Sequence, residues 1–216
     1  MLELLNNIHV PNILNTMQIQ QYIAQLQANV YVYSLIQVVC IWFILVAIGE
    51  LVSLISETFM KIMTVPFGRK GAFYICNYLT YIGTVHHELS HAIMATITGA
   101  KVTRIVLVPR EKKLGSVEFK TSTNFIFKSI QLVITSIAPV ACGLVSLYLM
   151  ITLIYGYCNE IWQILLFWYV FISIMIHMTL SKQDVSNIFR GLAVCMGLLY
   201  LILIVVQLNF GIIIHI

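Results

Sequence analysis

The stretch His87-Glu88-Leu89-Ser90-His91 lies in the middle of a segment that is otherwise apolar. Between Gly71 and Ala100, Glu88 is the only side chain that carries an obligatory charge. On a helix, a spacing of four residues places His87 and His91 on one face, one turn apart. A carboxylate and two imidazoles at membrane depth cost several kcal/mol unless something there uses them. The stretch therefore predicts a functional site inside a membrane helix.

The composition is that of a membrane protein. Apolar residues make up 60% of the chain, charged residues make up 9%, and the mean hydropathy is +0.95. A soluble domain carries about 25% charged residues. The 216 residues are too few for a separate soluble module, so we expect one integral-membrane domain over residues 1–216. The predicted fold class is an all-α polytopic membrane protein in a lipid bilayer.

Apolar runs locate about five transmembrane helices. Crossing roughly 30 Å of hydrocarbon takes about 20 apolar residues. The runs of suitable length are Val30 to Gly49 (extending towards Ile55), Ala72 to Thr98, Ser129 to Tyr155, Ile161 to Leu180, and Gly191 to Ile212. Residues 1–29 are polar and contain no Lys or Arg, and we interpret them as an amphipathic segment on the membrane surface.

The Lys and Arg residues predict an orientation. The connections after the second and fourth runs hold Lys101, Arg104, Arg110, Lys112, Lys113, Lys120, Lys128, Lys182 and Arg190. Only Lys61, Arg69 and Lys70 lie on the opposite side, which is a conflict within the pattern. Positive-inside counting then makes the N-terminus cytoplasmic. The net charge of +4 orients the protein and does not indicate a nucleic-acid partner.

The five cysteines show no C-x-x-C pairing. Four of them fall inside the apolar runs, where cysteine acts as a small packing residue. The sequence therefore predicts neither a disulfide framework nor a cysteine metal site.

Residues 101–120 form the only sizeable polar connection and predict a β-hairpin. Val102 to Val108 is β-branched and partly alternating, Pro109 to Gly115 is turn-like, and Ser116 to Phe119 alternates again. Two interpretations stay open. The hairpin is either a surface connection with no further role, or its free edge pairs with an unwound segment of a substrate through main-chain hydrogen bonds.

The H-E-x-x-H motif predicts a zinc site. Two imidazoles on one helix face can share Zn²⁺, and Glu88 between them can take a proton from water. The alternative without a metal is a polar contact between helices. A catalytic zinc has three protein ligands. The extended metzincin pattern, which would supply the third, is excluded because Met94 stands where that pattern requires glycine. The third ligand must therefore come from a distant part of the sequence.

Two residues compete for the place of third ligand. Asp184 is the only aspartate in the chain, and we place it at the cytoplasmic end of the fourth apolar run. Asp184 can contact His91 only if the helix of the fourth apolar run continues to about Arg190 and its end is buried in the protein. His177 lies seven residues earlier, on nearly the same helix face and two turns deeper. It is either a ligand or a residue that supports a ligand by hydrogen bonding.

Taken together, these residues resemble the site-2 protease type of intramembrane zinc metalloprotease, and most closely its small bacterial members. The motif stretch, continuing through Ala92 to Thr98-Gly99-Ala100-Lys101-Val102, resembles that family's motif helix and its membrane-associated hairpin. Ala138-Pro139-Val140-Ala141 is similar to the family's Gly-Pro turn, with Ala138 in the place of glycine. Asp184 occupies the place of the ligand aspartate, but Ser-Lys-Gln precedes it where the family has Leu. The resemblance covers roughly residues 74–190.

The resemblance implies a multi-pass zinc metalloendopeptidase of a bacterial cell membrane. Its substrate would be a transmembrane protein, cut within or near a membrane-spanning segment, in regulated signalling. His87, His91 and Asp184 would hold Zn²⁺, and Glu88 would be the catalytic base.

Two other functions compete with this one. The first is a membrane metalloprotease that acts on peptides at the cytoplasmic surface, in which a glutamate from a later helix commonly completes the metal site. The downstream glutamates are Glu111, Glu118 and Glu160, and none lies in a predicted span. The second is a non-catalytic metal-binding or transport protein, which would carry ionisable residues in several spans. The sequence names no particular substrate and no oligomeric state.

Overall fold

The computed structural model describes residues 29–107 and 115–210. The predicted surface segment at the N-terminus and the turn of the predicted hairpin lie almost wholly outside these ranges. The chain groups into two compact units, Met1–Trp42 with Leu198–Ile216, and Phe43–Gly197.

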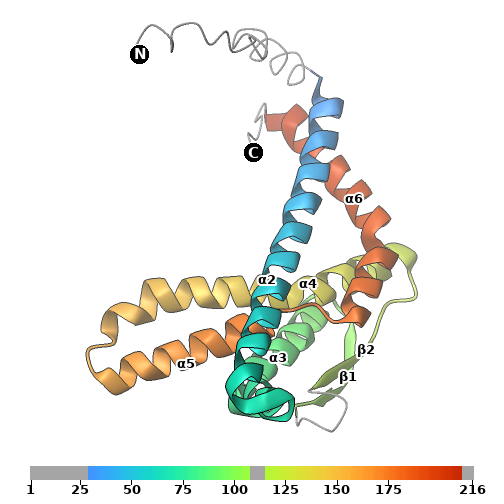
Figure 1. Ribbon diagram of the computed structural model, residues 1–216. Coiled ribbons are helices and arrows are strands. Elements are labelled where there is room, and N and C mark those ends of the chain that lie inside the picture. The colour runs from blue at the N-terminus through green and yellow to red at the C-terminus, as the bar shows by residue number, and fades with distance from the viewer. Residues whose placement is uncertain (1–28, 108–114, 211–216) are drawn as a thin grey trace, which may run out of the picture. The chain divides into compact units, whose positions relative to one another are not determined.

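The described residues are mostly helical and carry one small sheet (Figure 1). The elements in chain order are α2 (Val30–Tyr74), a π turn (Ile75–Leu79), α3 (Tyr81–Ile97), β1 (Lys101–Val106), β2 (Ser116–Lys120), α4 (Phe125–Leu149), a second π turn (Met150–Ile154), a 3₁₀ turn (Tyr155–Tyr157), α5 (Ile161–His177) and α6 (Lys182–Phe210). The predicted helical class is confirmed.

Three helical stretches of the described residues are long and apolar enough to cross a membrane. They are Val30–Leu79, Phe125–Tyr157 and Lys182–Leu208. Ile161–His177 is an apolar helix of 17 residues, and α3 has the same length. Long apolar helices with many large hydrophobic side chains exposed along them are typical of an integral membrane protein.

The predicted hairpin is confirmed. β1 and β2 are antiparallel, with Lys101 opposite Lys120 and Val106 opposite Ser116. The chain turns into β1 through a Schellman motif at the end of α3, where Gly99 has φ 77° and the Ala100 amide donates to the Ala95 carbonyl at 2.8 Å. The Schellman motif ends the helix that carries His87 and His91, and the hairpin that follows packs beside that helix (Figure 1).

The first two predicted spans have wrong boundaries. α2 runs on through the basic segment to a kink at Gly68, whose φ of 65° and ψ of 172° are open essentially only to glycine. The residues after the kink form the last part of α2 and then the first π turn. The motif helix therefore begins at Tyr81 and not at Ala72, because Thr80 leaves helical geometry with φ −97° and ψ 32°.

The larger unit has its apolar core between α2, α4 and α5. Its buried members are Val52, Val140, Met150, Phe167, Ile174 and Met178. α3 packs against both α4 and α5. The motif helix is thus held between two other helices.

The smaller unit joins the start of α2 to the end of α6 by buried polar side chains. The Ser34 hydroxyl donates to Gln207 Oε1 at 3.3 Å, and Gln207 Nε2 donates to Gln37 Oε1 at 2.6 Å. All three side chains are buried. Hydrogen bonds of this kind hold apolar helices together where a hydrophobic driving force between them is absent.

A glycine lets α3 and α5 approach at backbone distance. The Gly83 amide donates to the Ser173 hydroxyl at 2.9 Å, and that hydroxyl donates to the Thr80 carbonyl at 2.8 Å. A Cβ at Gly83 would overlap the Ser173 carbonyl and the His177 ring. The close approach matters because it fixes the end of α5 against the motif helix.

We expect Gly83→Ala to lower the free energy of unfolding by about 1–3 kcal/mol, since the added methyl group must push α5 away. The thermal midpoint of the purified protein in detergent measures this. Gly197→Ala is the matched control, because nothing lies within 4 Å of a Cβ there. In a helix this control should be neutral or gain up to about 1 kcal/mol. Equal midpoints for the two variants would contradict the close packing.

Candidate metal centre

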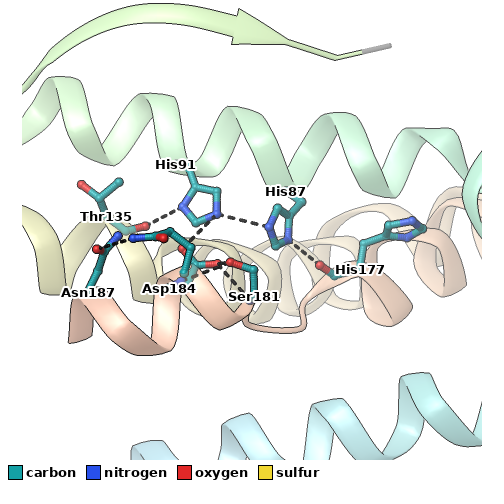
Figure 2. Close-up of polar contacts among 8 residues, drawn as sticks. His87, His91, Thr135, His177, Ser181, Asp184 and Asn187 are labelled. Atoms are coloured by element: carbon teal, nitrogen blue, oxygen red, sulfur yellow. Dashed lines mark hydrogen bonds and ion pairs between the residues drawn. The ribbon is translucent and has the colours of Figure 1, made fainter. Parts of the chain in front are cut away.

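The motif helix presents its two histidines to one point (Figure 2). The Nε2 atoms of His87 and His91 lie 3.2 Å apart. His91 Nε2 lies 3.7 Å from Asp184 Oδ1, and one ligand atom from each of the three residues lies within 4.8 Å of the others. Two ligand atoms at about 2.0–2.1 Å from a tetrahedral zinc are about 3.3 Å apart. The spacing fits a single small cation.

Both imidazoles are oriented by backbone carbonyls. His87 Nδ1 lies 2.6 Å from the His177 carbonyl oxygen, and His91 Nδ1 lies 2.7 Å from the Thr135 carbonyl oxygen. A carbonyl only accepts, so each Nδ1 carries the proton and donates it. The lone pairs of the two Nε2 atoms then face each other and repel. A proton or a cation between the two nitrogens removes this repulsion. Metal-bound histidines show this same pairing of one nitrogen with a carbonyl.

The two carbonyls are available because neither has an N–H donor within its own helix. In α4 the residue four positions after Thr135 is Pro139, which has no N–H to donate back. α5 ends at His177, and the last carbonyls of a helix have no partner inside it. The hydrogen bonds that orient the motif histidines therefore use acceptors that the neighbouring helices leave open.

Asp184 reaches the site from the first turn of α6. The Ser181 hydroxyl accepts from the Asp184 amide at 3.1 Å, while Asp184 Oδ2 accepts from the Ser181 amide at 2.9 Å and from its hydroxyl at 2.5 Å. This reciprocal arrangement is a capping box, here with aspartate as the acid. It holds Oδ2 and leaves Oδ1 facing His91.

The sequence-based placement of Asp184 at the end of the fourth span was wrong. α5 stops at His177, and the chain is non-helical from Met178 to Ser181 before α6 starts. Asp184 does not need a fourth helix that continues to Arg190, because a helix start delivers it to the same place. Its side chain is buried, with 7% of the residue exposed.

Glu88 is covered by the hairpin. The residue is 8% exposed and lies on the motif helix between the two histidines. A Cβ at Gly115, just before β2, would come within 2.8 Å of Glu88 Oε1. A side chain at this position would force Glu88 to move. The backbone at the start of β2 therefore lies directly against the carboxylate.

The ring of His177 does not join the group. Its Nδ1 lies 2.8 Å from the Ser173 carbonyl oxygen, and Figure 2 shows the ring turned away from His91 and Asp184. His177 contributes its main-chain carbonyl to the site. His86 also points elsewhere, with Nε2 2.9 Å from the Ser146 hydroxyl.

Two of the downstream glutamates lie in the described residues, and neither belongs to the three-residue group. Glu118 is exposed in β2, and Glu160 forms a capping box at the start of α5. Glu111 lies outside the described ranges.

Sequence reasoning missed Thr135 and Ser181. Each had a readable signal: Pro139 stands four residues after Thr135, and Ser181 and Asp184 have the S-x-x-D spacing of a capping box.

A family model described as peptidase M50B-like matches residues 58–213. No curated protein and no solved structure matches the chain. The matched range contains α3, the hairpin, α4 and α5, together with His87, Glu88, His91 and Asp184. It covers more than half of the chain and confirms the resemblance to site-2 protease-type enzymes at the level of the family. The chain therefore belongs to the peptidase M50B-like family, and the protein is an integral membrane metalloprotease.

Proposed function

We propose that this protein is a zinc endopeptidase that cuts a peptide bond within or near a transmembrane segment of a membrane-protein substrate. The observation that carries the proposal is the convergence of His87, His91 and Asp184, with His91 Nε2 3.2 Å from His87 Nε2 and 3.7 Å from Asp184 Oδ1, and with Glu88 between the two histidines on the motif helix. Two imidazole nitrogens and one carboxylate oxygen form a donor set that suits zinc and leaves a fourth position open.

The residues around the ion each have a separate task. Zinc bound there supplies Lewis-acid polarisation of the scissile carbonyl and makes water more acidic. Glu88 accepts the proton of the attacking water and delivers it to the amine that leaves. The Thr135 and His177 carbonyls hold the proton of each ring on Nδ1, so that each Nε2 turns its lone pair towards the metal position. Ser181 holds one oxygen of Asp184, so that the other serves as ligand.

The proposal includes a topology of five membrane-crossing helices, α2 to α6, in a bacterial cell membrane. α3 and α5 have 17 residues each, about 25 Å of helix, which is slightly short for the hydrocarbon layer. Both helices pack against each other and against α4. The exposed cations of the hairpin, Lys101, Arg104 and Lys120, support a cytoplasmic position for it and for the N-terminus.

The hairpin is the proposed docking site for the substrate backbone. A transmembrane helix has its amides bonded internally and must unwind before water can attack, so helix-breaking residues favour cleavage. A two-stranded sheet has an outer edge on each strand, and such an edge offers replacement main-chain partners. Because the start of β2 touches Glu88, a segment paired there would lie beside the catalytic base.

We expect the wild-type protein to hold about one zinc per chain and His87→Ala or Asp184→Ala to hold almost none, since a three-ligand site loses its affinity with one ligand. Elemental analysis after dialysis against a weak chelator measures this. His177→Ala is the matched control and should keep its zinc, because the carbonyl that contacts His87 remains. Zinc retained by Asp184→Ala but lost from His177→Ala would overturn the choice of third ligand.

Pro139→Ala should weaken zinc binding about 10–100-fold, which is the usual cost of losing a partner that orients a ligand. The new amide at position 139 competes with His91 for the Thr135 carbonyl. A competition titration with a fluorescent zinc chelator reports the affinity. Pro66→Ala removes the proline inside α2 and should leave zinc affinity unchanged. Equal affinities in both variants and the wild type would show that the freed carbonyl is unimportant.

Glu88→Gln should slow cleavage about 10²–10⁴-fold, since glutamine cannot accept a proton, while zinc content stays normal. Membrane proteomes of cells with the wild type and with this variant are compared for fragments that end inside a transmembrane helix. Glu118→Gln, on the exposed face of β2, should behave as the wild type. The same fragments at the same abundance with Glu88→Gln would remove the proposed mechanism.

A further inference from the structure

A cavity of about 470 Å³ opens at the kink of α2, and none of its lining residues belongs to the metal centre. Its walls are Met60, Lys61, Thr64, Arg69 and Phe73. On an uninterrupted helix, Lys61 and Arg69 would be about 12 Å apart along the axis. The Gly68 kink turns the chain between them, so that both cations line one hollow.

The cavity is electropositive. Between residues 51 and 80 the basic residues are Lys61, Arg69 and Lys70, and Glu57 is the only acid. Glu57 lies 3.9 Å from Lys61, with the two side chains 69% and 76% exposed, so the pair is weak. The Thr64 hydroxyl donates to the Met60 carbonyl and is already used. An anion would be bound by the ammonium and the guanidinium together.

The surroundings of the cavity are apolar and exposed. Large side chains at the kink include Ile62, Val65 and Phe67, and Val65 is 87% exposed. Tyr74 and Tyr78 stack with ring centroids 4.8 Å apart, and both are exposed. Cations beside exposed aliphatic and aromatic groups are typical of the interface between lipid head groups and acyl chains.

The length of α2 places the kink at this interface. The 38 residues before the Gly68 kink, 30–67, extend over about 57 Å, whereas roughly 20 residues suffice to cross the hydrocarbon layer. The most apolar part lies towards the N-terminal half, from Val30 to Ile55. The stretch from Lys61 to Phe73 therefore extends beyond the hydrocarbon, at the level of the lipid phosphates.

We propose that this cavity binds the phosphate of an anionic phospholipid, with Lys61 and Arg69 as the two cationic contacts. The site gives a role to Lys61 and Arg69, two of the three basic residues on the side of the membrane that is otherwise poor in Lys and Arg. It does not depend on the metal centre or on peptidase activity.

The full-length protein in lipid nanodiscs tests the site. The discs contain equal parts of phosphatidylglycerol and phosphatidylcholine, and native mass spectrometry counts the phosphatidylglycerol that stays bound after the disc is stripped. The wild type should retain phosphatidylglycerol in preference to phosphatidylcholine. Lys61→Gln and Arg69→Gln should each lower this retention about fivefold, the effect of one cation at a membrane surface.

Lys70→Gln is the matched control, because it removes the same charge beside Arg69 but does not line the cavity. Its retention should equal that of the wild type, and an equal loss in all three variants would mean general surface attraction and overturn the site. The same mixed discs with added inorganic phosphate form a second arm. Phosphate that displaces phosphatidylglycerol at low millimolar concentration would show a site for the free ion and also overturn the proposal.

Gly68→Ala gives an independent variant without a change of charge. It strains the kink backbone and should lower phosphatidylglycerol retention, while an unchanged helical circular-dichroism signal reports that the protein is still folded. If this variant retains as much phosphatidylglycerol as the wild type, lipid binding does not need the kink, which contradicts the proposed geometry.

Discussion

Two imidazole nitrogens that face each other at 3.2 Å in a buried position impose the main constraint on this molecule. Their other nitrogens are committed to carbonyls, so neither ring can turn away without losing a hydrogen bond. The buried carboxylates of Glu88 and Asp184 add up to two negative charges beside two neutral rings. One divalent cation neutralises that sum, whereas a proton would leave half of it uncompensated. The arrangement of α3 between its neighbours makes sense as the framework of such a site.

Breaks in helices provide the polar atoms that the site needs. Helical segments bury their own amides and carbonyls, which is why they are suited to a bilayer and poor in free acceptors. Pro139 opens one acceptor within α4, the end of α5 opens another, and the start of α6 delivers Asp184 through its capping box. The carbonyls opened in α4 and at the end of α5 each accept from a histidine of the motif.

The motif helix, the hairpin and the placing of His87 and His91 on one helix face were predictable, because each depends on local spacing in the sequence. The route of Asp184 was not predicted, since the four residues between α5 and α6 contain neither Gly nor Pro and read as a continuation of an apolar run. The competition between Asp184 and His177 depended on where one ring points, which periodicity does not determine. α2 was predicted too short, because its basic segment resembles a loop although it continues as a helix up to Gly68.

The wide separation of the proposed metal ligands along the chain has a consequence for biosynthesis. His87 and His91 are made and inserted long before the ribosome reaches Asp184 in α6. A nascent chain that has completed only α3 carries the imidazole nitrogens of His87 and His91. It lacks the Asp184 carboxylate and the His177 carbonyl that orients the His87 ring. On the proposed mechanism, proteolytic competence arrives only with α6, and a translation product that stops before α6 would be inert towards its neighbours.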